Sequence, residues 1–178
     1  MTKTSFRCLP VLFLIFLMAA VCALSLPSPA AAQGGVTLPA GTKLLVKMET
    51  LIVSGQAGKG DPFTGVLEKP VTVEGKTVFP RGTKVHGQVI VAVDVGNISG
   101  RPAIGIHLVE VETQSGTVPI KTLSQGFVGT TGGTVNNVVT GKVVGPAGPG
   151  VVVDSMGRVT IKPGALIEFS LVEAVGVE

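Results

Sequence analysis

The sequence predicts an all-β protein: an antiparallel β-barrel or sandwich-like closed sheet with a glycine-rich insertion before the last strands. Three observations lead to this prediction. A short phrase containing proline, glycine and alternating apolar residues occurs three times. Several apolar segments flank the two-residue sequences that favour β-hairpin turns. Apolar residues in these segments recur with period 2, which places one face of a strand in a core and the other in solvent.

The repeated phrase is a turn followed by a strand. It occupies residues 38–48, residues 79–89 and, in a shortened form, residues 161–171. Proline sets φ and removes a backbone donor, while glycine supplies a backbone angle that other residues resist. The alternating residues that follow predict a half-buried strand at the beginning, middle and end of the sheet.

Residues 1–32 are predicted to form a signal peptide. Lys3 and Arg7 make a charged start, which is followed by an apolar run and an Ala-x-Ala sequence ending at residue 32. This pattern fits cleavage before residue 33. An uncleaved anchor is the alternative, since the apolar run approaches the roughly 18 residues from which a spanning helix becomes plausible. Residues 33–178 match the size of one β-barrel domain.

Composition excludes several classes of function for the exported part. The chain has 14 basic and 11 acidic residues, and two basic residues fall in the leader, so the remainder is nearly neutral. A nearly neutral chain without Trp or Tyr lacks the basic stripe and stacking platforms of nucleic-acid-binding proteins. It also lacks the aromatic girdles of a transmembrane barrel. Cys8 and Cys22 both lie in the leader, so no disulfide framework is expected.

The first elements follow in order after the leader. Residues 33–37 predict a loose start, and residues 42–48 alternate as a strand. The glycine-rich residues 54–60 predict a flexible loop, because no Ser or Thr follows Lys59 as a phosphate-binding loop requires. Residues 61–67 begin the next strand.

Three hairpins are predicted next, centred on Glu74-Gly75, Gly96-Asn97 and Ser115-Gly116. We predict the register of each hairpin by placing apolar residues of one strand opposite apolar residues of the other. The predicted pairs are Val71 with Val78 and Thr72 with Thr77 in the first hairpin, Val85 with Leu108, Gly87 with Ile106, His86 with His107 and Val89 with Ile104 in the second, and Val111 with Ile120 and Glu110 with Lys121 in the third.

The segment 125–150 interrupts this pattern with many glycines and two prolines. We predict a glycine-rich loop or a short helix over residues 134–144, because Val135, Val138 and Val139 fall on one side of a helix. Strands then resume on both sides of a turn at residues 154–157, and the third copy of the phrase closes the chain.

Four segments, taken in order, carry a resemblance to a known family. They are Leu38-Pro-Ala-Gly-Thr42, Glu49-Thr-Leu-Ile-Val-Ser54, Phe79-Pro-Arg-Gly-Thr83 and Val159-Thr-Ile-Lys-Pro-Gly164. Their order resembles the C-terminal β-barrel domain of TrbI-type proteins, which are scaffold subunits of the outer-membrane core complex in type IV secretion and conjugation machines. The resemblance spans about residues 37–176 and implies a β-barrel with a scaffold role.

The sequence also departs from that family. TrbI-type scaffolds carry an inner-membrane anchor, a long periplasmic segment and a helical hairpin that contributes to an outer-membrane pore. This sequence predicts a cleavable leader, almost nothing between the leader and the barrel, and no long apolar helix in residues 125–158. The chain is therefore similar to a small, stand-alone relative of the barrel.

His86 and His107 are the only residues that the sequence suggests as a metal-binding or acid-sensing pair, and Glu110 lies nearby. Two imidazoles across a strand pair can ligate a metal ion or respond to acid near pH 6. A metal site normally needs three or four ligands, so two solvated histidines are the simpler interpretation. No serine lies in a nucleophile-elbow context, and the carboxylates fall in turns or on outward faces. We therefore expect no catalytic residue, no cofactor and no metal site.

The sequence favours a non-catalytic exported module, periplasmic or associated with the cell envelope, that acts as a scaffold or in protein interaction. Its expected partners are other envelope proteins or further copies of itself, contacted through an exposed sheet edge. Neither a nucleic-acid partner nor a membrane span after signal cleavage is expected. The alternative is a small-ligand-binding exported domain in which the glycine-rich segment 125–150 acts as a mobile lid.

Overall fold

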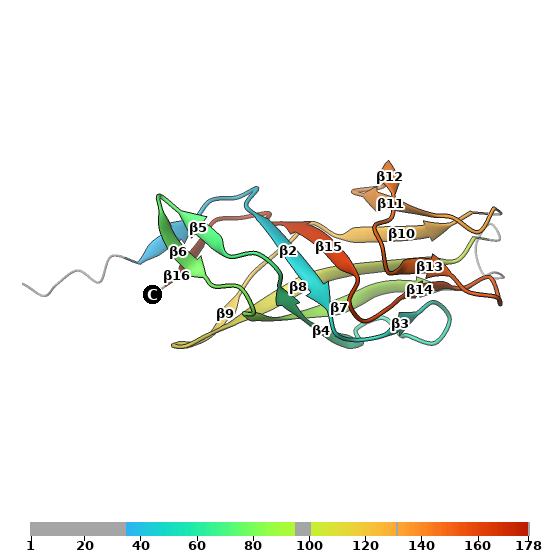
Figure 1. The fold of residues 1–178 in the computed structure, drawn as a ribbon, viewed down its shortest axis with the longest axis horizontal. Helices are drawn as coiled ribbons and strands as arrows, with labels where there is room; N and C mark the ends of the chain where they lie inside the picture. The colour runs from blue at the N-terminus through green and yellow to red at the C-terminus, as the bar shows by residue number, and fades with distance from the viewer. Residues whose placement is uncertain (1–34, 95–100, 131, 178) are drawn as a thin grey trace, which may run out of the picture. The chain divides into compact units, whose positions relative to one another are not determined.

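The computed structural model describes residues 35–94, 101–130 and 132–177, and every helix or strand assigned there is a β-strand (Figure 1). The predicted signal peptide, residues 1–32, and the predicted turn at Gly96-Asn97 lie outside the described residues. Within the described ranges, no helix is long and apolar enough to cross a membrane. The predicted all-β, antiparallel architecture is confirmed, because the main sheet is a strongly curled antiparallel half-barrel.

The strands follow one another with short connections. In chain order they are β1 (Val36–Leu38), β2 (Lys43–Met48), β3 (Ile52–Val53), β4 (Pro62–Leu67), β5 (Val71–Val73), β6 (Lys76–Phe79), β7 (Lys84–Val93), β8 (Ala103–Thr113), β9 (Gly116–Pro119), β10 (Gln125–Gly129), β11 (Val135–Val139), β12 (Lys142–Pro146), β13 (Val151–Val153), β14 (Val159–Ile161), β15 (Leu166–Ser170) and β16 (Val175–Val177).

The main sheet has nine strands in the order β12-β11-β10-β8-β7-β4-β2-β15, with β9 paired to β8 outside this path. Its curl brings β15 close to the segment that follows β9, where Thr122 forms an isolated bridge with Leu171. The same threonine accepts a hydrogen bond from the amide of Leu108 in β8, at 2.9 Å. This short segment therefore links β8 to β15 across the open side of the curled sheet.

Three smaller ladders complete the fold. The three-stranded sheet β13-β14-β3 packs against β10 and β11, and Val159 of β14 lies close to Gly129 of β10. The ladders β1-β16 and β5-β6 lie beside each other at one end of the unit (Figure 1). One contiguous core joins these layers, and its largest members are four phenylalanines that are at most 1% exposed: Phe63, Phe79, Phe127 and Phe169.

Each copy of the repeated phrase forms the same turn. Gly41, Gly82 and Gly164 have φ values of 84°, 85° and 89°, in the left-handed region that glycine adopts at no steric cost. The turns are closed by Thr42 N to Pro39 O at 3.3 Å, Thr83 N to Pro80 O at 3.2 Å, and Ala165 N to Lys162 O at 3.1 Å. A positive φ at the third turn position with this closing bond is typical of a type II turn.

Each of these turns also holds the end of a neighbouring strand through two backbone hydrogen bonds, which we call a two-bond clamp. The glycine amide donates to the carbonyl of a buried residue, and the amide of that buried residue donates back to the carbonyl of the residue after glycine. The clamps join Gly41 and Thr42 to Leu171, Gly82 and Thr83 to Leu67, and Gly164 and Ala165 to Met48, over 2.7–3.0 Å. Two of them close opposite ends of the β2–β15 ladder, and the third joins the start of β7 to the end of β4.

Two predictions of where strands lie are wrong. The expected loose start at residues 33–37 instead contains the beginning of β1, which pairs with β16. The segment predicted as a glycine-rich loop or short helix contains β10, β11 and β12. Thr140 and Gly141 both adopt positive φ and connect β11 to β12 tightly, and β10 pairs with β8, so tertiary pairing overrides the weak strand propensity of glycine.

The predicted hairpins form, but their registers differ. In the first, Thr72 faces Thr77 as predicted, whereas a bulge places Val71 opposite Phe79. In the second, the pairing already differs from the predicted register at Val93 with Ala103, the end of the ladder next to the connection, and the observed pairs further along are Val85 with Val111, His86 with Glu110, Gly87 with Leu108 and Val89 with Ile106. In the third, the turn lies one residue earlier, and the observed pairs are Val111 with Val118 and Glu110 with Pro119. The bulge accounts for the difference in the first hairpin, because it inserts a residue that a simple two-residue turn does not anticipate.

We predict that Gly87→Ala destabilises the fold. A Cβ at this position would lie 2.1 Å from Cζ of Phe63 and 2.5 Å from the carbonyl oxygen of His107, so the phenyl ring and the strand must move. Overpacking of this kind costs about 1–3 kcal/mol in the free energy of unfolding, measured by denaturant titration. Gly176→Ala, in β16, is the matched control, because a Cβ there meets no atom within 4 Å. Equal losses for the two variants would contradict the packing argument.

Candidate functional site

The two histidines do not form the predicted cross-strand pair. His86 lies opposite Glu110, and His107 lies opposite Gln88. The His86 Nε2 atom is instead 2.8 Å from Oε1 of Glu112. Among residues 35–94, 101–130 and 132–177, no group of three or more His, Cys, Asp or Glu side chains is placed to hold a metal ion. The predicted opposition fails because β7 and β8 pair in a different register along the whole ladder, from Val93 with Ala103 to Val85 with Val111.

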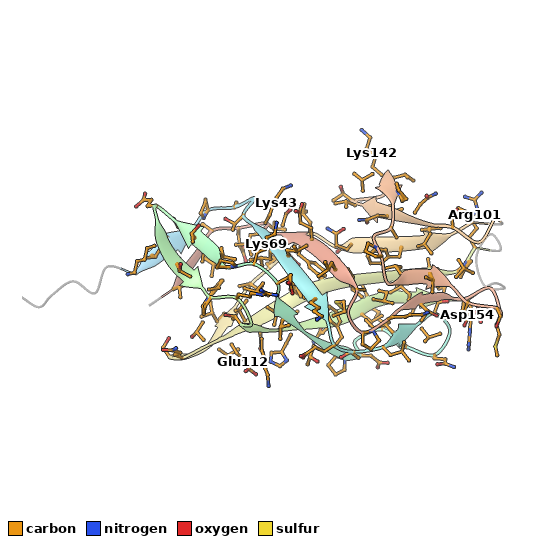
Figure 2. The ribbon with its side chains drawn as sticks, viewed as in Figure 1. Lys43, Lys69, Arg101, Glu112, Lys142 and Asp154 are labelled. Carbon is orange, nitrogen blue, oxygen red and sulfur yellow. The ribbon has the colours of Figure 1, made fainter. Side chains whose placement is uncertain are left out.

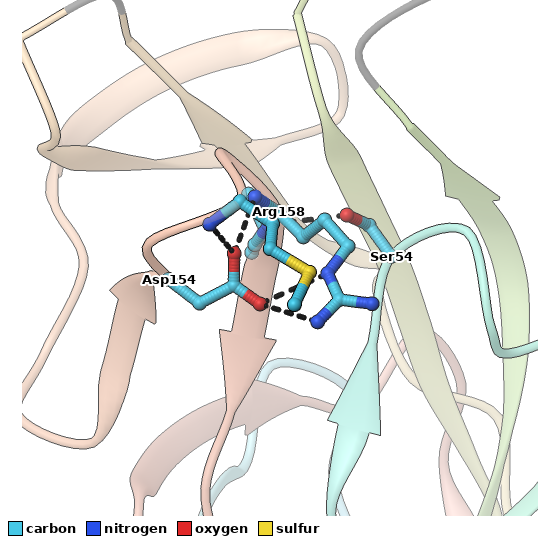
Figure 3. Close-up of polar contacts among 5 residues, drawn as sticks. Ser54, Asp154 and Arg158 are labelled. Carbon is cyan, nitrogen blue, oxygen red and sulfur yellow. Dashed lines mark hydrogen bonds and ion pairs between the residues drawn. The ribbon is translucent and has the colours of Figure 1, made fainter.

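A polar cluster lies in the turn between β13 and β14 (Figure 3). Asp154 Oδ1 accepts hydrogen bonds from the amides of Met156 and Arg158, both at 2.9 Å. Asp154 Oδ2 accepts from Arg158 Nε at 2.9 Å and forms an ion pair with Arg158 Nη2 at 2.8 Å. The hydrogen bond from the backbone N–H of Arg158 lowers the pKa of Asp154, although desolvation of the carboxylate opposes this shift. Hydrogen bonds from the Arg158 side chain and from the backbone N–H of Met156 lower the pKa further.

Ser54 connects the loop after β3 to the start of β14. Its side chain is fully buried, and its Oγ accepts a hydrogen bond from the amide of Val159 at 3.1 Å. Its own amide donates to the Val159 carbonyl at 2.9 Å. The Ser54 hydroxyl therefore satisfies a buried backbone N–H by accepting its hydrogen bond. This structural role is sufficient to explain why the hydroxyl is buried. An aspartate at the first position of a turn is a sequence pattern that could have predicted the Asp154 cluster. No local pattern could have predicted the contact of Ser54 with Val159, because the two residues are 105 positions apart.

The clearest surface feature is the hairpin formed by β11 and β12. Val143 and Val144 are 61% and 64% exposed, on the outermost strand of the main sheet. Figure 2 shows the side chain of Lys142 pointing away from the body of the unit. We call Lys142, Val143 and Val144 the β12 surface.

The strands β12 and β9 carry features that limit strand addition at their exposed edges. The last residue of β12 is Pro146, and the last residue of β9 is Pro119, and neither proline offers an N–H to a further strand. The pairing of β12 with β11 is also irregular between Asn137 and Val138. Proline and bulges are devices by which natural sheets limit edge pairing. An interaction at the β12 surface therefore depends on side chains more than on backbone bonds.

A groove of about 710 Å³ lies between the turn that precedes β7 and the β8–β9 hairpin. Two of its charged residues already have partners. Arg81 bonds Glu68 at 2.6 Å, and Glu112 bonds His86 at 2.8 Å. The remaining walls are mainly hydroxyl, glycine and apolar groups, and Lys84 is the third charged residue of the lining.

Comparison with known proteins gives no match, either to a protein family or to a curated protein sequence. The residues described above are therefore the basis for assigning a function.

We predict that Asp154 makes stability depend on pH in the acid range. The folded state lowers its pKa below the ordinary value of 3.8, so its contribution is present above that value and is lost as pH falls through the folded-state pKa. The free energy of unfolding, measured from about pH 5 to about pH 2, should fall more steeply in the natural chain than in Asp154→Asn, which cannot titrate. Identical slopes would show that the carboxylate contributes nothing to this dependence.

Proposed function

We propose that the chain is a non-catalytic interaction module that contacts a protein partner through the β12 surface. The supporting observation is the exposure of Val143 and Val144, at 61% and 64%, on a hairpin at the margin of the sheet. Most other strand valines pack into or against the core, for example Val46, Val85 and Val111, which are fully buried. Two adjacent exposed β-branched side chains at a sheet margin are a candidate contact site.

Side-chain contact gives a definite scale for this interaction. Complete burial of each valine against a partner contributes about 1.5–3 kcal/mol, before the costs of association are subtracted. Lys142 adds a positive charge at the rim, where charges mainly affect the association rate and its dependence on salt. A contact of this size supports a transient complex or one part of a larger interface.

The proposal places the module in the cell envelope, with a scaffold role. The predicted leader and the order of the four segments that resemble the TrbI-type barrel support this location and role. The curled antiparallel sheet is compatible with that resemblance. The proposed partners are other envelope proteins or further copies of the chain.

Small-ligand binding is the second candidate, and the 710 Å³ groove is the observation in its favour. A lid formed by the glycine-rich segment receives no support, because most of that segment is built into the main sheet as β10, β11 and β12. Ligand binding would therefore rely on the β8–β9 hairpin and the turn before β7.

Site-specific photocrosslinking tests the interaction proposal. We predict that a photoreactive residue at position 143 gives a discrete protein adduct in intact cells of the native host, and that Val144→Asp reduces this adduct at least about tenfold, because a charge would be buried in the contact. The matched control is a photoreactive residue at position 172, since Val172 is also exposed, at 43%, but lies beyond β15.

Two results would contradict the proposal. One is the same adduct pattern from positions 143 and 172, and the other is an adduct at position 143 that Val144→Asp leaves unchanged. Unaltered unfolding of the purified Val144→Asp variant is the control that separates lost contact from lost fold. An adduct composed of two copies of the chain identifies self-association as the interaction.

A further inference from the structure

The described residues contain two methionines in opposite environments. Met48 is 1% exposed, at the end of β2, and its amide and carbonyl both take part in a two-bond clamp. Met156 is 72% exposed, in the turn between β13 and β14. Cys8 and Cys22 fall outside the described residues, so these two thioethers are the sulfur groups that the described part of the chain offers to an oxidant.

The turn around Met156 is held by contacts that do not involve its side chain. Its amide donates to Asp154 Oδ1 at 2.9 Å, and the same carboxylate is bonded to both the backbone and the guanidinium of Arg158. Two further backbone bonds span the turn: Asp154 N to Arg158 O at 2.8 Å, and Gly157 N to Asp154 O at 3.0 Å. The Met156 sulfur can therefore become more polar without the loss of any of these hydrogen bonds.

From this difference we propose that Met156 is a reversible oxidation site for oxidants of the peroxide class. The peroxide O–O bond breaks, one oxygen atom forms a bond to the thioether sulfur, and hydrogen peroxide leaves as water. Sulfur loses two electrons and becomes a sulfoxide, while the peroxide is reduced. A methionine sulfoxide reductase with a dithiol reductant reverses the change, releasing water and forming a disulfide in the reductant.

Accessibility provides the selectivity. Oxidation of a thioether requires contact between the oxidant and sulfur, so an exposed side chain reacts while a core side chain is protected until the fold opens. A sulfoxide at Met48 would place a polar group in the core, whereas a sulfoxide at Met156 would face solvent. Oxidation at Met156 is therefore a surface modification that leaves the fold intact.

Peroxide treatment of the purified full chain, followed by peptide mapping with mass spectrometry, tests this proposal. The expected result is sulfoxide formation at Met156 at least about tenfold faster than at Met48, with recovery of unmodified Met156 after addition of methionine sulfoxide reductase and dithiothreitol. Met156→Leu should leave the oxidation rate of Met48 unchanged. In denaturant the two methionines should react at similar rates, which establishes folding as the source of selectivity.

The thermal midpoint of unfolding provides a second measurement. Chain oxidised only at Met156 should unfold at the same temperature as untreated chain. Similar oxidation rates at Met156 and Met48 in the folded chain would overturn the proposal, and so would a lowered midpoint or a sulfoxide that the reductase cannot remove. None of these results depends on whether the β12 surface binds a partner.

Discussion

The two-bond clamp between a glycine turn and the end of a neighbouring strand is the constraint on which the rest of the sheet depends. It requires a positive φ at the glycine, and it uses both backbone groups of a buried residue. Two clamps hold opposite ends of the β2–β15 ladder, and the third holds the junction of β4 with β7. Because a one-residue slip would expose the buried face of a strand, the clamps fix which valines and phenylalanines reach the core. The curled sheet is also linked through Thr122, which bridges to Leu171 and accepts a hydrogen bond from Leu108.

The β12 end of the sheet contrasts with the opposite end, where two of the three clamps hold the ladder of β2 with β15. Prolines end both β9 and β12, so the backbone at these edges is protected from strand addition. The β12 surface nevertheless exposes two valines that the core does not use. A fold that restricts backbone pairing while presenting apolar side chains favours a defined contact over open-ended aggregation. This combination is the observation behind the proposed interaction module.

Sequence reasoning succeeded where the determining forces were local. Proline, glycine and period-2 alternation identified β2, β7 and β15, because turn chemistry and one-sided burial operate within about ten residues. It failed where distant segments decide the outcome. The register of β7 on β8 already differs from the prediction at Val93 with Ala103, beside a connection that the prediction took as a two-residue turn, and the strand character of residues 125–146 depends on pairing with β8. The exposure of Val143 could not be predicted, because it depends on which strand ends the sheet.

Hydrogen exchange at the amides of Met48, Leu67 and Leu171 tests the role of the clamps most directly. Each amide donates to the residue after a turn glycine, and each of these three residues is at most 2% exposed. If the clamps organise the sheet, the three amides exchange only through global unfolding and share one free energy of opening, close to that of the whole unit. Exchange at any of them as fast as at the amide of Val143 would show that the turns open independently, and would contradict the account.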